Sequence, residues 1–374
     1  MPLQPPLPPT LIPYVSPPPR SSLTLVTSVL GATSNWLVLR FLLAALGSGS
    51  TRAGTATING REDGGNGDEG LKGGRRKVVL LSFLRNWEFW KSEAKRLGLD
   101  LARLSDQGRF AFIDGLSELF YSSSASSAPS PPSPSLAHSG SAVPPSRTTT
   151  LPVRSPPGAV PARVPGTPPA TTGSSSNRVS TVSESTKRLR FTGRGTAALD
   201  SLEKDVLAVV EELKTKGPTA VNSDGSNDEN GIVLVIDQPD LLLAATGSSQ
   251  GIGATEMGEW IMGLEQRVHS TILTVSADFP LVHNAAVSPT SLEGIATPLE
   301  TEHAAFVIGL AHRARMVMQL RNLDTGAAKD VSGVLRVSKG GGALDEELDW
   351  EEKEVLYFVQ RDAGVRVFGR GEMS

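Results

Sequence analysis

The chain has 374 residues, a formal net charge of −3 at pH 7 and 39% hydrophobic residues. The slightly negative charge excludes a global attraction to nucleic acid and leaves such contacts to local basic patches. The chain contains no cysteine, which excludes disulfides, thiolate nucleophiles and Cys-ligated zinc.

Residues 1–20 form a proline-rich arm, MPLQPPLPPTLIPYVSPPPR. Proline fixes φ and removes a hydrogen-bond donor, so the arm is predicted to be extended and polyproline-like. Two readings stay open for it, a disordered tail or a strap whose apolar side chains lie across a neighbouring surface. No basic stretch precedes an apolar core here, so we expect no signal peptide. The longest apolar run, Trp36–Leu46, is about half a membrane span, so we expect a soluble cytoplasmic protein without membrane contact, with the nucleus as a second location.

One α/β domain is predicted over residues 21–121 and 188–374. The elements expected in its first part are a strand over Leu23–Val29, a helix from Trp36, a Gly-rich loop over 47–74, a strand over Val78–Phe83, a helix over Asn86–Leu97 ended by Gly98, a loop or short helix over 101–108, and a strand over Phe110–Ile113.

Residues 122–187 are rich in Ser, Pro and Thr and are predicted to be a disordered insertion, because such a segment buries too little apolar surface to offset its chain entropy. The elements expected after it are helices over Ala197–Lys214, Thr255–Val268 and Leu299–Ala311, strands over Ile232–Ile236, Thr271–Val275 and Ala314–Leu320, and antiparallel strands over Gly333–Ser338, Val355–Gln360 and Val365–Phe368, with a hairpin turn at Asp362–Gly364. The alternation of strands and helices predicts a mainly parallel sheet with right-handed crossovers.

The first strand and the helix from Trp36 flank the place where a P-loop NTPase carries its phosphate cradle. That cradle needs glycines whose N–H groups converge on phosphates, a Lys, and a Ser/Thr for Mg²⁺. Gly31–Trp36 supply one glycine and no lysine. We therefore expect a scaffold without turnover, with no catalytic, nucleotide-binding or metal-binding residues and no cofactor. Thr33 and Ser34 are either a residual nucleotide contact or, as the favoured reading, part of a helix N-cap made by Ser34 or Asn35.

Two acidic residues hold positions that an active NTPase uses. Ile232–Asp240 has the form of a Walker B strand that ends in Asp237, which either helps to hold Mg²⁺ or caps the following turn. Glu88 follows the second strand and is either a water-activating base or part of a solvated helix face. In both cases the structural reading is favoured, because no phosphate site accompanies them. A divergent ATPase using Asp237 and Glu88 stays open as the alternative.

Basic clusters are the strongest candidates for contact with nucleic acid through phosphates. The alternative is that they flank strands and solubilise loops. No aromatic pattern of the RNP type accompanies them. The candidate residues are Lys72, Arg75, Arg76 and Lys77 before the second strand, and Lys187, Arg188, Arg190 and Arg194 after the insertion. A further group around the late strands, Arg313, Arg315, Arg321, Arg336 and Lys339, is suited to contact a neighbouring subunit.

Four segments resemble the family of the sixth subunit of the Elongator complex in its fungal form: LTLVTSVLGATSNWLVLRFLL, VVLLSFLRNWEFWKSEAKRLGLDL, RFAFIDGLSELF and IVLVIDQPDLLLAATG. The resemblance covers both ordered parts, about 20–120 and 188–374, and leaves out the low-complexity middle.

This resemblance implies a RecA-like domain that has lost the usual nucleotide motifs. It also implies a hetero-hexameric ring with the fourth and fifth Elongator subunits, which attaches to the larger subunits, binds tRNA and supports carboxymethyl-type modification of wobble uridine. The chemistry belongs to another subunit. In such rings the pore-facing loops would be residues 238–254 and 278–298, which contain no Lys or Arg. A pure scaffold without tRNA contact is therefore a further alternative.

Overall fold

The computed structural model describes residues 7–16, 18–47, 76–121, 186–216, 231–282, 296–323, 326, 328–343 and 350–369. The chain divides into one unit of Met1–Tyr121 with Val182–Ser374 and a second unit, Ser122–Thr181, that lies outside the described residues. Most of the predicted Gly-rich loop and the predicted disordered insertion up to residue 185 also lie outside them.

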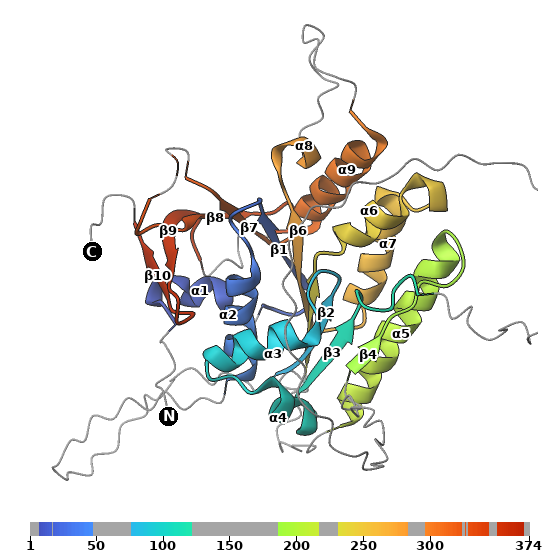
Figure 1. The fold of residues 1–374 in the computed structure, drawn as a ribbon, viewed down its shortest axis with the longest axis horizontal. Coiled ribbons are helices and arrows are strands. Elements are labelled where there is room, and N and C mark those ends of the chain that lie inside the picture. The colour runs from blue at the N-terminus through green and yellow to red at the C-terminus, as the bar shows by residue number, and fades with distance from the viewer. Residues whose placement is uncertain are drawn as a thin grey trace, which may run out of the picture. The chain divides into compact units, whose positions relative to one another are not determined.

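Among the described residues of the first unit, ten strands form one sheet, in the order β10-β9-β8-β7-β1-β6-β5-β2-β3-β4 (Figure 1). Strands β1 to β7 pair in parallel, whereas β7 to β10 pair antiparallel. The strands are β1 (Ser22–Ser28), β2 (Lys77–Ser82), β3 (Phe110–Asp114), β4 (Thr186–Arg188), β5 (Ile232–Asp237), β6 (Ser270–Ser276), β7 (Met316–Arg321), β8 (Gly333–Lys339), β9 (Lys353–Val359) and β10 (Val365–Phe368).

The central order β7-β1-β6-β5-β2 is the strand arrangement of a RecA-like domain, in which one strand separates the P-loop strand from the Walker B strand. Here β6 separates β1 from β5. The predicted fold class, a mainly parallel RecA-like sheet with terminal antiparallel strands, is therefore confirmed.

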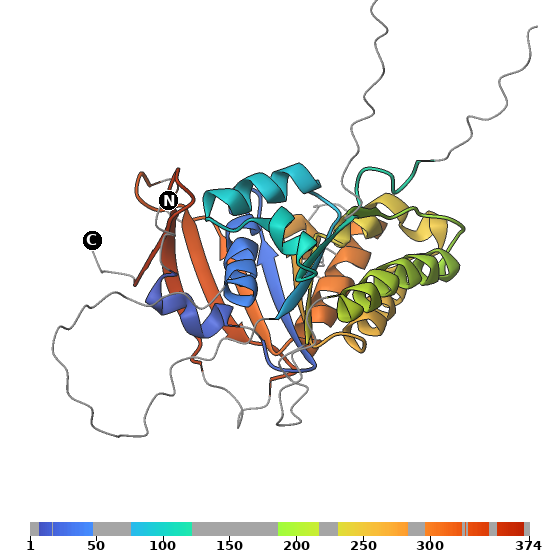
Figure 2. The same cartoon turned by 90° about the horizontal axis from the view of Figure 1, so that it is seen from below.

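Two helical layers cover the sheet (Figure 2). One hydrophobic core lies under α1 to α4 and the other under α5, α6, α7 and α9. Because both faces of the central strands are covered, β1 and β5 are buried along their whole length, which explains their continuous apolar runs. The helices are η1 (Pro9–Leu11), α1 (Ile12–Val15), α2 (Asn35–Leu46), α3 (Trp87–Arg96), α4 (Leu101–Asp106), α5 (Thr196–Thr215), α6 (Asp240–Thr246), η3 (Ser248–Gln250), α7 (Ala254–Glu265), α8 (Phe279–Val282) and α9 (Pro298–Arg313). None of these helices is both long and apolar enough to cross a membrane.

The proline-rich arm differs from its prediction over residues 7–16. Instead of an extended strap, it forms the helical turns η1 and α1. Leu11, Tyr14 and Val15 are buried in the first core, and the Tyr14 hydroxyl donates to the Glu351 carbonyl at 2.9 Å. Proline is compatible with the first turn of a helix, where its missing N–H has no intrahelical partner, so Pro9 and Pro13 do not prevent these turns. The arm thus belongs to the fold of its own chain.

Three further boundaries correct the sequence analysis. The predicted insertion reached residue 187, but Thr186–Arg188 form β4, which pairs with β3. The predicted pore loop 238–254 contains helix α6, and residues 279–282 of the second form α8. The remaining predicted strands and long helices are present within a few residues of their expected ends, and Gln360 N donates to Gly364 O at 2.8 Å to close the final hairpin.

Candidate functional site at the carboxyl edge of the sheet

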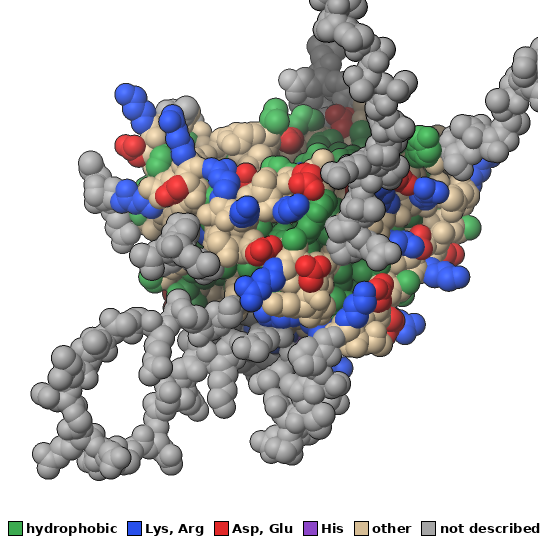
Figure 3. Space-filling model, turned by 60° about the horizontal axis from the view of Figure 1, so that its bottom comes forward, with side chains coloured by type: hydrophobic (Ala, Val, Ile, Leu, Met, Phe, Trp, Pro, Cys, Tyr) green, Lys and Arg blue, Asp and Glu red, His purple; other side chains and the backbone are tan. Residues whose placement is uncertain are grey.

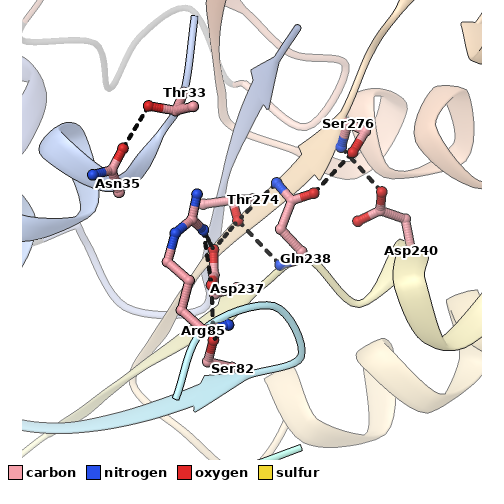
Figure 4. Close-up of polar contacts among 9 residues, drawn as sticks. All are labelled: Thr33, Asn35, Ser82, Arg85, Asp237, Gln238, Asp240, Thr274 and Ser276. Carbon is pink, nitrogen blue, oxygen red and sulfur yellow. Dashed lines mark hydrogen bonds and ion pairs between the residues drawn. The ribbon is translucent and has the colours of Figure 1, made fainter. Parts of the chain in front are cut away.

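Polar side chains meet where β2, β5 and β6 end. Ser82 pairs with Asp237 in the register of β2 and β5, and Asp237 pairs with Thr274 in the register of β5 and β6. Parallel strands present their carboxyl ends at one edge, where α/β proteins bind ligands. The three side chains therefore lie at the same level of this edge, as Figure 4 shows.

Asp237 is completely buried, and its carboxylate accepts hydrogen bonds from donors of the same chain. It accepts hydrogen bonds from Ser82 Oγ at 2.8 Å and from Thr274 Oγ1 at 3.0 Å. Arg85 Nη1 lies 3.1 Å from Oδ1 and 3.2 Å from Oδ2. Burial raises the pKa of Asp237, while Arg85, Ser82 and Thr274 act in the opposite direction. The acid that ends β5 is thus held by partners within the chain.

Arg85 is held in place from several sides. It follows β2, and its backbone N–H donates to Ser82 Oγ at 3.0 Å. Its guanidinium lies over the rings of Phe89 and Trp90, at 5.3 and 5.8 Å from their centroids, and its side chain is only 14% exposed. Arg85 is not among the residues predicted from the sequence. A signal existed, since Arg85 comes two residues after a predicted buried strand, at the edge where Asp237 also lies.

A second polar group lies beside the first. Gln238 has a φ of +59°, and its backbone N–H donates to Thr274 O at 3.0 Å. The Ser276 hydroxyl donates to Gln238 Oε1 at 2.8 Å. Ser276 N donates to Asp240 Oδ2 at 3.2 Å, and His303 Nε2 lies 3.4 Å from the same oxygen. These contacts join the ends of β5 and β6 to α9.

The β1–α2 connection does not form a phosphate cradle. Ala32 N donates to Val29 O at 2.9 Å, and Leu30 N donates to Asp278 Oδ1 at 2.9 Å. Asn322, which follows β7, donates a hydrogen bond from Nδ2 to Leu30 O at 2.9 Å. Contacts within the chain therefore hold this turn, and the carboxylate of Asp278 accepts the hydrogen bond of one of its backbone N–H groups.

The predicted N-cap position of α2 is correct, but the predicted side-chain capping hydrogen bond is not formed. Ser34 is at the N-cap position, but its side chain makes no capping bond, and its buried Oγ has no hydrogen-bond partner among the described residues. Its backbone carbonyl accepts from Leu37 N and Val38 N. Thr33 Oγ1 donates to Asn35 Oδ1 at 2.6 Å, apart from the Asp237 network (Figure 4).

Glu88 does not join the site. Its side chain is 73% exposed on the first turn of α3 and lies 3.8 Å from Lys91. This arrangement matches the solvated helix face that the sequence analysis favoured. Within the described ranges, no group of three or more acidic or histidine side chains is placed to hold a metal ion.

The predicted basic residues are largely engaged within the chain. Lys77 Nζ donates to the Leu213 carbonyl at 2.8 Å at the end of α5, and burial lowers the pKa of Lys77. Glu118 pairs with Arg190 and Arg188, whose hydrogen bonds lower the pKa of Glu118. The remaining pair is Lys187 with Asp205, at 3.1 Å.

Arg194 is exposed, Arg76 directly precedes β2, and Lys72 and Arg75 lie outside the described residues. On the face drawn in Figure 3, Lys and Arg side chains alternate with Asp and Glu side chains. Lys187, Arg188 and Arg190 thus lie beside acids at the β3–β4 edge.

No protein-family model matches the chain, and no curated protein matches it. Among solved structures, a KaiC-like protein from the hyperthermophilic archaeon Pyrococcus horikoshii matches 94% of this chain and 91% of its own, at 12% sequence identity and a TM-score of 0.41. Likeness at this level indicates neither activity nor partners. The RecA-like assignment rests on the strand order described above.

Proposed function

We propose that this chain is a non-catalytic RecA-like subunit of the Elongator subunit 6 type. In this proposal it joins the fourth and fifth subunits in a hetero-hexameric ring that attaches to the larger subunits and binds tRNA. The ring supports carboxymethyl-type modification of wobble uridine, and this chain hydrolyses no ATP. The observation that supports the non-catalytic part of this proposal is that the Asp237 carboxylate already accepts hydrogen bonds from Arg85, Ser82 and Thr274.

An ATPase needs the Walker B acid to face a hydrated Mg²⁺ and needs cationic groups around the phosphates. Asp237 is buried and bound to an internal guanidinium instead. A triphosphate at the β1–α2 turn would meet the carboxylate of Asp278, which adds repulsion. Both features favour a role in assembly over turnover.

The tRNA part of the proposal depends on basic groups at the β3–β4 edge. Lys187, Arg188, Arg190 and Arg194 are the accessible candidates there. Lys187 pairs with Asp205, and Arg188 and Arg190 share Glu118. This sharing favours a second candidate function, a scaffold that assembles the ring while its partners hold the tRNA.

Native mass measurement of the chain co-expressed with the fourth and fifth subunits tests the assembly. We expect one complex with two copies of each subunit, and a chain that stays alone would overturn the proposal. Ultraviolet crosslinking of tRNA to that ring then separates the two functions. Adducts on this chain that decrease in an Arg194→Glu variant support tRNA contact, whereas adducts only on the partners support the scaffold.

A further inference from the structure

The β3–β4 end of the sheet carries exposed aromatic side chains. Among the described strands β4 is the last at this end, and the segment after it lies beside the segment that follows β3 (Figure 1). Phe120 and Tyr121, after β3, are 54% and 64% exposed. The ring of Phe120 lies 5.6 Å from that of Phe191, which follows β4. We call Phe120, Tyr121 and Phe191 the aromatic cluster. Large apolar groups that gather on a surface mark binding sites.

Backbone contacts hold the aromatic cluster in place. Phe191 N donates to Leu119 O at 2.6 Å, and Leu189 N donates to Asp114 O at 2.8 Å. Leu119 and Leu189 are buried in the second core, and Phe191 packs against it. The ring of Phe120 therefore rests on a fixed neighbour while more than half of its surface stays accessible. A ligand that packs on such a ring orders few further side-chain rotamers on binding.

The two segments that carry the aromatic cluster are basic, although the whole chain has a formal net charge of −3. Residues 116–121 contain one acid, Glu118, whose two oxygens accept hydrogen bonds from Arg188 and Arg190. Lys187 pairs with Asp205 of α5. The cations of the second segment are Lys187, Arg188, Arg190 and Arg194. One carboxylate cannot neutralise two guanidinium groups, so positive charge remains beside the aromatic cluster.

Accessible rings beside an excess of arginines suit a ligand that has flat faces and a negatively charged backbone. The side chains of Arg188 and Arg190 are 41% and 54% exposed, so both can contact a ligand while they pair with Glu118. Unpaired nucleotides offer bases that stack on aromatic rings and phosphates that accept charge-assisted hydrogen bonds. In a duplex the bases already stack on one another, so a duplex offers mainly its phosphates. The excess of cations also favours a polyanion over an apolar protein surface.

We propose that the aromatic cluster and its arginines bind unpaired nucleotides of an RNA. One base stacks on Phe120, Tyr121 offers its ring to a neighbouring base, and Arg190 and Arg194 contact the phosphates. The inference rests on the tRNA part of the proposed function and specifies it, because the site binds a loop or a single-stranded end and not a stem.

Fluorescence anisotropy with labelled RNA tests this inference on the purified full chain. We expect tighter binding of a single-stranded oligouridine than of a duplex RNA of matched length. Phe120→Leu keeps an apolar side chain but removes the ring, and it should weaken binding of the single strand about fivefold or more, whereas Phe120→Tyr should bind as the wild type does. Ile308→Ala, at a 49% exposed position of α9, is the surface control. Unchanged affinity in both Phe120→Leu and Tyr121→Leu would overturn the inference.

The salt dependence of binding gives a second readout that tests the arginines. Arg190→Gln leaves Glu118 paired with Arg188 and should reduce the slope of log K against log salt by about one, the value for one lost phosphate contact. Arg190→Lys keeps the charge and should keep the slope. An unchanged slope in Arg190→Gln would contradict the proposed phosphate contact.

Native mass measurement of the Phe120→Leu variant with the fourth and fifth subunits separates this inference from the ring proposal. An intact ring with weakened RNA binding supports both. Lost assembly with unchanged RNA affinity would identify the aromatic cluster as a subunit interface and overturn the inference. RNA binding that depends on Phe120, in a chain that forms no ring even as the wild type, would support the inference and overturn the ring proposal.

Discussion

The guanidinium of Arg85 lies 3.1 Å from the carboxylate of Asp237, which is completely buried at the end of β5. Arg85 follows the neighbouring strand β2, so the pair connects the carboxyl ends of two strands. In an NTPase this edge holds the metal and the phosphates. Here the guanidinium of Arg85 pairs with the Asp237 carboxyl group instead. The contact stabilises the sheet at the position where an NTPase would hydrolyse nucleotide.

Replacement of Arg85 by Met is predicted to lower the free energy of unfolding by about 3–5 kcal/mol, because it leaves a buried carboxylate without its cation. Urea denaturation of the purified chain measures this loss. The double variant Arg85→Met/Asp237→Leu is the control and should recover most of the stability, since no buried charge remains. A single Arg85→Met variant as stable as the wild type would show that the ion pair is not structural.

Gln238 holds a left-handed backbone conformation that glycine adopts without cost. Gln238→Ala and Gln238→Gly both remove the hydrogen bond from Ser276, but only glycine relieves the backbone. We predict that the glycine variant unfolds with a free energy about 1 kcal/mol higher than the alanine variant. Equal midpoints with equal slopes in urea would indicate that the position is unstrained.

The arm is predicted to contribute to stability through its buried residues. Leu11 is fully buried, and Leu11→Ala should cost about 2–5 kcal/mol. Ile12, its neighbour, is 38% exposed, and Ile12→Ala should cost far less. Thermal and urea unfolding of the two variants provide a matched comparison. Equal effects at both positions would indicate that the arm does not pack on the core.

Tyr357 gives a prediction at alkaline pH. Its ring packs 4.8 Å from that of Trp36, and burial raises the pKa of Tyr357 from 10.0 to about 12. The unfolded chain therefore loses this proton first, and the stability held below pH 10 is lost as pH rises toward 12. Two pKa units correspond to about 2.7 kcal/mol.

The control for this effect is Tyr357→Phe, which has no proton to lose. The difference in unfolding free energy between wild type and Tyr357→Phe should stay constant below pH 10 and shift in favour of Phe between pH 10 and 12. A difference that is independent of pH would show that Tyr357 titrates as in the unfolded chain.

The sequence predicted the central sheet well because its strands are covered on both faces. Ile232–Ile236 and Val78–Leu81 are apolar at every position, a pattern that long-range contacts reinforce. The final hairpin followed from the turn chemistry of Asp362–Gly364, where Gly364 N donates to Asp362 Oδ1 at 2.9 Å. In these segments local propensity and tertiary packing agree.

Other features depend on contacts that a local pattern does not contain. The helical turns of the arm depend on burial of Leu11 and Val15 against the core, which outweighed the extended preference of a proline-rich segment. Strand β4 has only three residues and gains its pairing from β3. The pairing of Arg85 with Asp237 joins residues far apart in the chain. Only the strand order, which the sequence analysis did not specify, brings them together.

Calorimetric titration of MgATP tests the non-catalytic assignment most directly. The titration is carried out on the purified chain and on assembled rings that contain either the wild-type chain or its Asp237→Asn variant. We expect no saturable binding by the chain alone, with any Kd weaker than about 1 mM, and equal ring turnover with either form. Micromolar binding by the chain, or ring turnover that is lost with Asp237→Asn while the ring stays intact, would contradict it.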